Sequence, residues 1–174
     1  AAIANELGLT KQALLHHFGS KERLYGDVLK QISDRFADID PHTHAPDASA
    51  TDQLVAYLLE LSAPIKFNPN ATRVLMRELL DNRRRADTAG TWYLKSFLER
   101  LIDMVRAVPN WTNATETQAL AFIYQILGAI NYFSISEPTL TGIFGENAYK
   151  AHETAHPEQL EQLIRAGLAA RPAA

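Results

Sequence analysis

Residues 3–25 decide the fold, and they have the sequence IANELGLTKQALLHHFGSKERLY. Two short helices are predicted here, over about 1–7 and 11–17, with a tight turn between them. Gly8 suits the position where a left-handed residue ends a helix, and Thr10 is a good N-cap for the second helix. A helix, a tight turn and a short second helix have the layout of a helix-turn-helix. Helix–turn–helix corners with a purely structural role are also common in all-α proteins.

Small and apolar residues supply the packing that such a unit needs. Ala4 is small where two helices cross closely, and Leu9, Leu14 and Phe18 are expected as apolar anchors. Ser20 caps a third helix, predicted over about 21–38. Its apolar stripe and margin are expected to comprise Leu24, Val28, Ile32, Arg35 and Phe36.

The rest of the chain is also predicted to be helical, because no segment alternates between apolar and polar residues as a half-buried strand does. A polar linker over 40–52 contains two prolines and divides a small module, 1–40, from a larger body, 41–174. Helices are expected at about 52–62, 70–82, 91–108, 115–134 and 157–170, and a loop or irregular turn is expected over 136–146. The fold class is therefore all-α.

Residues 3–25 resemble the DNA-binding core of the TetR/AcrR family of transcriptional regulators. That core has an Ile-Ala pair, a Leu-Gly turn closed by Ser or Thr, and a recognition helix that ends in aromatic residues. A small residue, Ser, Lys, an acid and Leu follow, and Phe18-Gly19-Ser20-Lys21-Glu22 is the most specific part of the match. The resemblance implies an N-terminal helix-turn-helix DNA-binding module joined to a larger helical ligand-binding and dimerisation domain.

The resemblance also implies contacts with a double-stranded DNA operator. Gln12, at the groove-facing start of the recognition helix, can bind adenine through its amide. Lys21, at the start of the next helix, resembles the family's phosphate-anchoring lysine, where charge and helix dipole act together. The residues expected to contact DNA are Thr10, Lys11, Gln12, Ala13, His16, His17 and Lys21.

The sequence departs from the family pattern in two ways. Leu15 and His17 stand where the family usually has tyrosines; Leu15 cannot hydrogen-bond a phosphate, and a neutral His17 does so only weakly. The family also has a helix before this motif, which these 174 residues are expected to lack. A chain that begins at Ala1 is then expected to bind DNA poorly.

Composition limits the remaining possibilities. The chain has no cysteine, so a disulfide framework and a thiolate metal site are excluded. No run of about 20 uninterrupted apolar residues and no secretory signal is present, so a cytoplasmic location without a membrane contact is expected. The net charge of −3 is an average: residues 1–38 carry five bases and five acids, and residues 66–106 carry nine bases and five acids. Local lysines therefore decide any DNA contact.

Polar side chains on otherwise apolar helices of the body suggest a cavity for a small-molecule effector, although a packed core with a few satisfied polar groups has the same composition. Arg73 and Arg77 lie one turn apart and could hold an anionic ligand, but pairing with Glu78 or Asp81 is the commoner arrangement. The stretch 83–85 is expected to be a solvated loop. The candidate ligand contacts are Arg73, Met76, Arg77, Trp92, Phe97, Tyr124, Asn131 and Tyr132.

The segment 115–134 is apolar on nearly all sides, so most of its surface must be buried. Together with an apolar stripe over 157–170, it predicts a four-helix homodimer interface, which is also how dimers of the TetR/AcrR family are built. A dimer suits an operator with two half-sites about one helical turn, or a multiple of it, apart.

No catalytic motif, cofactor-binding loop or complete metal-ligand set is found. His152 and His156 have i,i+4 spacing without a third ligand, and they are interpreted as a chance pair. The leading hypothesis is therefore not an enzyme but a ligand-responsive transcriptional regulator, a repressor that a small molecule releases from its operator. The alternative is a helical small-molecule-binding module with no DNA-binding activity.

Overall fold

The computed structural model describes residues 2–37, 47–63, 69–81 and 94–172. Within these ranges it contains helices and no strand, so the predicted all-α class is confirmed. Trp92, the basic stretch 83–85 and most of the predicted linker lie outside the described residues. The helices are α1 (Ala2–Glu6), α2 (Lys11–Phe18), α3 (Lys21–Ala37), α4 (Ala50–Ser62), α5 (Pro69–Asp81), α6 (Lys95–Ala107), the 3-10 helix η2 (Pro109–Trp111), α7 (Glu116–Phe144) and α8 (Glu146–Ala169).

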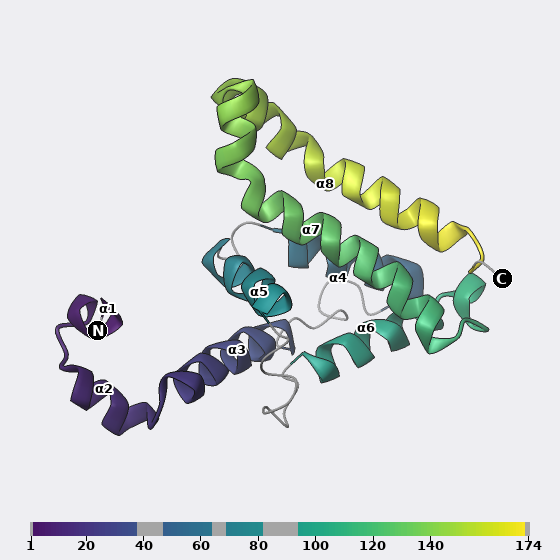
Figure 1. The fold of residues 1–174 in the computed structure, drawn as a ribbon. Helices are drawn as coiled ribbons and strands as arrows, with labels where there is room; N and C mark the ends of the chain where they lie inside the picture. Colours follow the sequence, from purple (N-terminus) through teal and green to yellow (C-terminus); the bar gives the residue numbers. More distant parts are fainter. Residues whose placement is uncertain (1, 38–46, 64–68, 82–93, 173–174) are drawn as a thin grey trace.

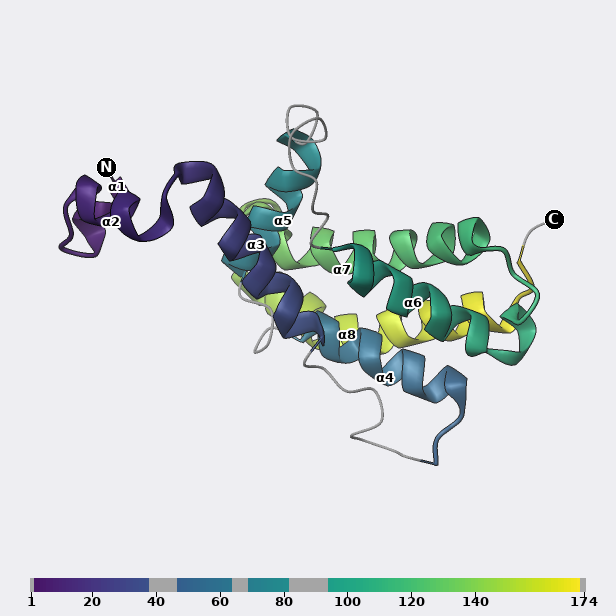
Figure 2. The same cartoon turned by 90° about the horizontal axis from the view of Figure 1, so that it is seen from below.

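The helices form a small N-terminal unit and a larger helical body. Figures 1 and 2 show α1 and α2 at one end of the molecule, with α3 running from them into the body. In the body the two longest helices, α7 and α8, lie side by side and antiparallel. α4, α5 and α6 pack on α7, and α4 also packs on α8. Because α3 contacts α2 of the N-terminal unit as well as α5 and α6 of the body, it connects the two parts.

The body is held together by a core to which α3, α4, α5, α6, α7 and α8 all contribute. Tyr57 and Leu61 of α4 are almost inaccessible to solvent, as are Leu101 of α6, Ile123 of α7 and Ile164 of α8. Each fully buried aliphatic or aromatic side chain contributes about 1.5–3 kcal/mol. The central element of this core is α7, which begins at the predicted Thr115 cap: Thr115 and Gln118 satisfy each other's backbone N–H groups in a capping box.

The loop predicted over 136–146 is wrong. α7 continues to Phe144 and α8 begins at Glu146, with only Gly145, at φ +86°, between them. Pro138 and Pro157 both lie inside helices. A proline removes only one backbone hydrogen bond, and α7 continues past Pro138 although none of residues 137–148 is buried.

The predicted apolar stripe of α3 is partly wrong. Ile32 and Phe36 are buried as expected, but Leu29 is buried in place of Val28, which is 37% exposed. Arg35 is exposed and Leu24 only half-buried. Successive helical residues point about 100° apart, so the prediction placed the buried face about one residue away from the true one.

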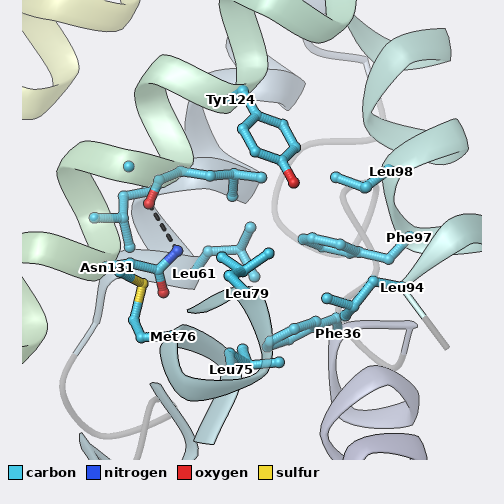
Figure 3. Close-up of a pocket in the computed structure, with 13 residues that line it drawn as sticks. Phe36, Leu61, Leu75, Met76, Leu79, Leu94, Phe97, Leu98, Tyr124 and Asn131 are labelled. Carbon is cyan, nitrogen blue, oxygen red and sulfur yellow. Dashed lines mark hydrogen bonds between the residues drawn. The ribbon is translucent and has the colours of Figure 1, made fainter. Parts of the chain in front are cut away.

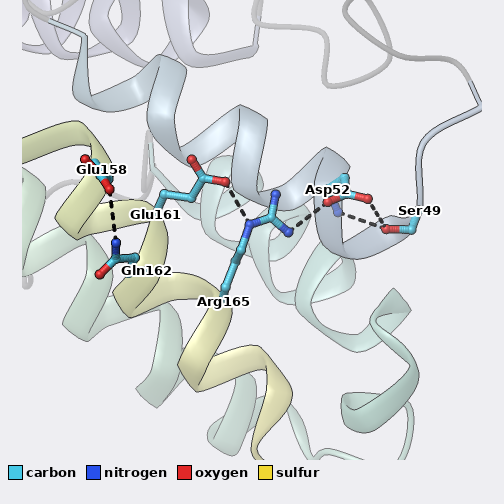
Figure 4. Close-up of polar contacts among 6 residues, drawn as sticks. All are labelled: Ser49, Asp52, Glu158, Glu161, Gln162 and Arg165. Atoms are coloured by element: carbon cyan, nitrogen blue, oxygen red, sulfur yellow. Dashed lines mark hydrogen bonds and ion pairs between the residues drawn. The ribbon is translucent and has the colours of Figure 1, made fainter.

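A polar cluster joins α4 to α8 at the surface (Figure 4). Arg165 donates hydrogen bonds to Asp52 Oδ1 and Glu161 Oε1, each at 2.8 Å. Ser49 caps α4 and donates to Asp52 Oδ2 at 2.6 Å. These hydrogen bonds, Ser49 first and Arg165 second, lower the pKa of Asp52. Because the cluster is open to solvent, it contributes little to stability.

His152 and His156 are part of an aromatic contact between α7 and α8. The His156 ring stacks on Phe133 with centroids 3.6 Å apart, and the His152 ring meets Phe133 edge-on at 5.1 Å. Burial, followed by the neighbouring His152, lowers the pKa of His156. The described residues contain no group of three or more metal-ligating side chains.

By length and composition α7 is apolar enough to cross a membrane, with a mean hydropathy of 1.4 over its most apolar 18-residue window. Only 28% of that window is buried within the chain. A core helix of a soluble protein passes the same test, and α7 contacts α4, α5, α6 and α8. The expectation of no membrane contact therefore stays a prediction, and the exposed apolar surface of α7 needs another explanation.

The packing of α7 on α8 can be tested at two glycines. A Cβ at Gly167 would lie 2.5 Å from Cε2 of Phe122. We therefore expect Gly167→Ala to lower the free energy of unfolding by about 1–3 kcal/mol. The control is Gly142→Ala, whose Cβ meets nothing within 4 Å, and which should raise that free energy by about 0.5–1 kcal/mol through helix propensity. Urea denaturation measures both, and equal effects would contradict the described packing.

Candidate nucleic-acid interface and ligand cavity

The turn between α1 and α2 has the geometry predicted for a helix-turn-helix. Gly8 adopts φ +65°, and the following Leu9 N–H donates to the Ala4 carbonyl at 2.8 Å. Thr10 Oγ1 accepts a hydrogen bond from the Ala13 N–H at 3.0 Å, so the predicted N-cap is confirmed. Ala4 is buried where the two helices meet. Local side-chain chemistry therefore fixes where α2 begins.

The end of α2 is equally well defined. Gly19 adopts φ +77°, and its N–H donates to the Leu15 carbonyl at 2.7 Å. Ser20 Oγ accepts a hydrogen bond from the Arg23 N–H at 3.1 Å, which confirms Ser20 as the cap of α3. With a cap on each helix and a left-handed glycine between them, the orientation of α2 relative to α3 is set by residues 19 and 20.

All seven residues expected to contact DNA are exposed. Lys11, Gln12 and Ala13 form the first turn of α2, where the helix dipole favours a phosphate. His17 lies in the last turn, with its ring edge-on to Phe18 at 4.6 Å. Lys21 is the first residue of α3. The structure thus leaves these side chains accessible to a groove, while their contacts with DNA stay predictions.

The N-terminal unit buries little apolar surface of its own. Leu14 and Phe18 are half-buried, but Leu9, which was expected as an anchor, is 49% exposed because its backbone closes the turn. Ile3 and Leu7 are also exposed. The placement of the unit therefore depends on α3.

Polar and aromatic contacts fasten α3 to the body. The Tyr25 hydroxyl donates to the Val74 carbonyl of α5 at 3.4 Å. At the last turn of α3, the Tyr57 hydroxyl donates to the Phe36 carbonyl at 3.0 Å, and the Phe36 ring lies 4.7 Å from that of Phe97. Burial raises the pKa of Tyr57, which keeps its hydroxyl protonated as a donor.

A cavity of about 150 Å³ lies beside this last turn of α3. Figure 3 shows side chains of α3, α5, α6 and α7 converging on it, with the Tyr124 hydroxyl pointing toward Phe97 and Leu98. The lining residues are Phe36, Leu61, Leu75, Met76, Leu79, Leu94, Phe97, Leu98, Tyr124, Leu127, Gly128, Ile130 and Asn131. Among these, only Tyr124 and Asn131 carry polar side-chain groups.

Half of the candidate ligand contacts meet at this cavity: Met76, Phe97, Tyr124 and Asn131. Arg73, Arg77 and Tyr132 are exposed and do not line it. Arg73 instead donates to Asn70 Oδ1 at 3.1 Å.

The purely apolar residues of the lining were not predicted to contact a ligand. Leucines such as Leu75 and Leu98 carry no feature that distinguishes a cavity wall from an ordinary core position. Phe36 was predicted as a core residue of the third helix, and only its position at the helix end, next to α6, shows that it also lines the cavity.

Comparison with known proteins identifies the N-terminal unit. Residues 1–28 match the family model of the bacterial regulatory proteins, tetR family. These residues comprise α1, α2 and the first turns of α3. No curated protein and no solved structure matches the chain. The matched residues are those of the capped helix-turn-helix described above, so the N-terminal unit is similar to the DNA-binding region of the bacterial regulatory proteins of the tetR family.

Proposed function

We propose that this protein is a cytoplasmic, homodimeric repressor that a small molecule releases from its operator. The proposal is based on Phe36, which belongs both to the cavity wall and to α3. Its side chain lines the cavity of the body, and its backbone belongs to the last turn of the helix that also carries Lys21. A ligand that enters the cavity therefore meets the helix on which the DNA-binding surface depends.

The length of α3 converts a small displacement into a larger one. A helix of 17 residues is about 25 Å long. Tilting it by about 10° around the cavity end moves the Lys21 end by about 4 Å. A shift of this size in each subunit changes the separation of the two recognition helices in a dimer, which must match the half-site spacing.

The ligand must distinguish the two forms strongly. To convert a population that is 99% operator-competent into one that is 99% released, it must bind the released form about 10⁴-fold more tightly, or about 5.5 kcal/mol. Movement of Phe36 and its aromatic neighbour Phe97 provides contacts that differ between the two forms.

The outer surface of α7 and α8 supports the dimer. Tyr132 of α7 is 72% exposed and Leu163 of α8 is 54% exposed. Ala121 of α7 is exposed as well, and a small residue lets two helices approach closely. A symmetric contact between the two α7–α8 pairs would bury this apolar surface.

DNA binding can be tested with Lys21→Ala and Gln12→Ala in the full-length protein, using DNA upstream of its own gene. We expect Lys21→Ala to weaken binding to all sequences and to reduce the slope of log K against log salt by about one. Gln12→Ala should cost about 1–3 kcal/mol and relax specificity at one base position.

The matched control is Lys30→Ala, which removes a lysine of the same helix that pairs with Asp34 at 2.7 Å. Gel shifts over a range of salt concentrations should show no change for this variant. If the unmodified protein gives no salt-sensitive, sequence-dependent shift, the repressor proposal fails and the alternative, a helical small-molecule-binding module without DNA binding, is favoured.

The dimer can be tested with Tyr132→Asp and Leu163→Asp, each of which places a charge on the proposed interface. We expect both to produce monomers in analytical ultracentrifugation and to abolish tight operator binding. Leu80→Asp is the control, because Leu80 of α5 is 81% exposed and lies outside the α7–α8 surface. A dimer that survives both interface substitutions would contradict the proposed contact.

A further inference from the structure

We infer that the effector is an uncharged, single-ring aromatic molecule that carries one hydroxyl group, a substituted phenol in chemical class. This inference rests on the proposed function, since it names the ligand of the cavity that controls α3. Charge, size, shape and hydrogen bonding of the cavity each contribute one part of it.

The lining excludes a charged ligand. Among the residues that the structure describes, none that lines the cavity carries a formal charge, and apart from Tyr124 and Asn131 these lining residues are apolar. An ion that leaves water for such a surrounding loses its hydration without gaining a counter-charge, which is strongly unfavourable. Arg73 and Arg77, the cations expected to hold an anion, are exposed and do not line the cavity.

The volume of the cavity suits a ligand of one ring. A cavity of about 150 Å³ equals an engineered cavity, lined by Leu, Ile and Phe in another protein, that binds benzene (~150 Å³). A six-membered ring with one or two small substituents therefore fills the space.

The walls favour an aromatic ring over an aliphatic one. The rings of Phe36 and Phe97 lie 4.7 Å apart with an interplanar angle of 39°. Both rings line the cavity, so the ring of an aromatic ligand can add to this pair. Met76 lies beside Asn131 in Figure 3, and its flexible thioether adapts to the outline of a ring substituent.

Of the two polar side chains that line the cavity, Asn131 favours a ligand that carries a hydroxyl group. Asn131 Nδ2 donates to the Leu127 carbonyl of its own helix at 2.7 Å, and this bond fixes the orientation of the amide. Within the part of the chain that the structure describes, Asn131 Oδ1 has no hydrogen-bond donor. An amide oxygen accepts a hydrogen bond, so a ligand O–H that displaces water from Asn131 Oδ1 restores the hydrogen bond that the water made.

The test measures the binding of three probes to the full-length protein by isothermal titration calorimetry at pH 7. The probes share one frame: p-cresol carries a neutral hydroxyl, toluene carries no polar group, and 4-methylbenzoate carries a negative charge. We expect p-cresol to bind about fivefold more tightly than toluene, the effect of one net hydrogen bond, and 4-methylbenzoate to bind at least tenfold more weakly than either.

Two variants locate the binding. Asn131→Leu should remove the preference for p-cresol and leave toluene binding unchanged, whereas Asn147→Leu, at an exposed position of α8, should keep the preference. Met76→Trp should weaken all binding at least tenfold, because its side chain fills the cavity. Circular dichroism and urea denaturation of each variant identify one that has simply unfolded, and Met76→Phe then replaces Met76→Trp as a smaller side chain that still takes up space in the cavity.

The inference is overturned if 4-methylbenzoate binds as tightly as p-cresol, if no probe binds at millimolar concentration, or if Asn131→Leu leaves the preference intact. The proposed function is judged by a separate measurement, the release of operator DNA. If an anion releases operator DNA, the inferred ligand class is wrong, whereas the proposed repressor function is supported. Binding of p-cresol without release of operator would support the ligand class and contradict the repressor.

Discussion

The hydrogen bond from the Tyr57 hydroxyl to the Phe36 carbonyl is the contact on which the rest of the arrangement depends. It holds the last turn of α3 against α4, inside the core, and it places the Phe36 ring against Phe97 and the cavity. The N-terminal unit buries little apolar surface of its own, so its orientation relative to the body is set by α3. A buried carbonyl that lost this donor would cost about 1–3 kcal/mol, and the helix that carries the DNA-binding surface would lose its fixed end.

Sequence reasoning succeeded where the cause of structure is local. Thr10, Ser20 and Thr115 cap their helices because a hydroxyl three residues before a backbone N–H can reach it in any fold. It failed over residues 136–146, where proline and glycine were read as ending the helix. A proline removes only one hydrogen bond, and α7 continues to Phe144 past Pro138.

The candidate site shows the same division. The exposed face of α2 follows from the spacing of its residues, so the structure leaves every expected DNA contact accessible. The cavity was predicted only at residues such as Asn131, whose polarity is unusual on an apolar helix. Leu61 and Leu75 look like any other core residue in sequence, since a wall of a cavity and a filled core differ only in what faces them. Arg73 was expected to contact ligand, but its face of α5 points to solvent.

The double position of Phe36 has a consequence for anyone who would turn this protein into a biosensor. In the proposed repressor, a wall residue that also ends the helix of Lys21 would tie ligand selectivity to background expression, because a substitution there would alter the operator affinity in the absence of ligand together with the response to ligand. Met76 and Asn131 lie on α5 and α7, so they offer a route to new selectivity that leaves α3 untouched. The distribution of the cavity wall over several helices therefore determines which positions can be varied, by evolution or by design, without raising expression in the absence of ligand.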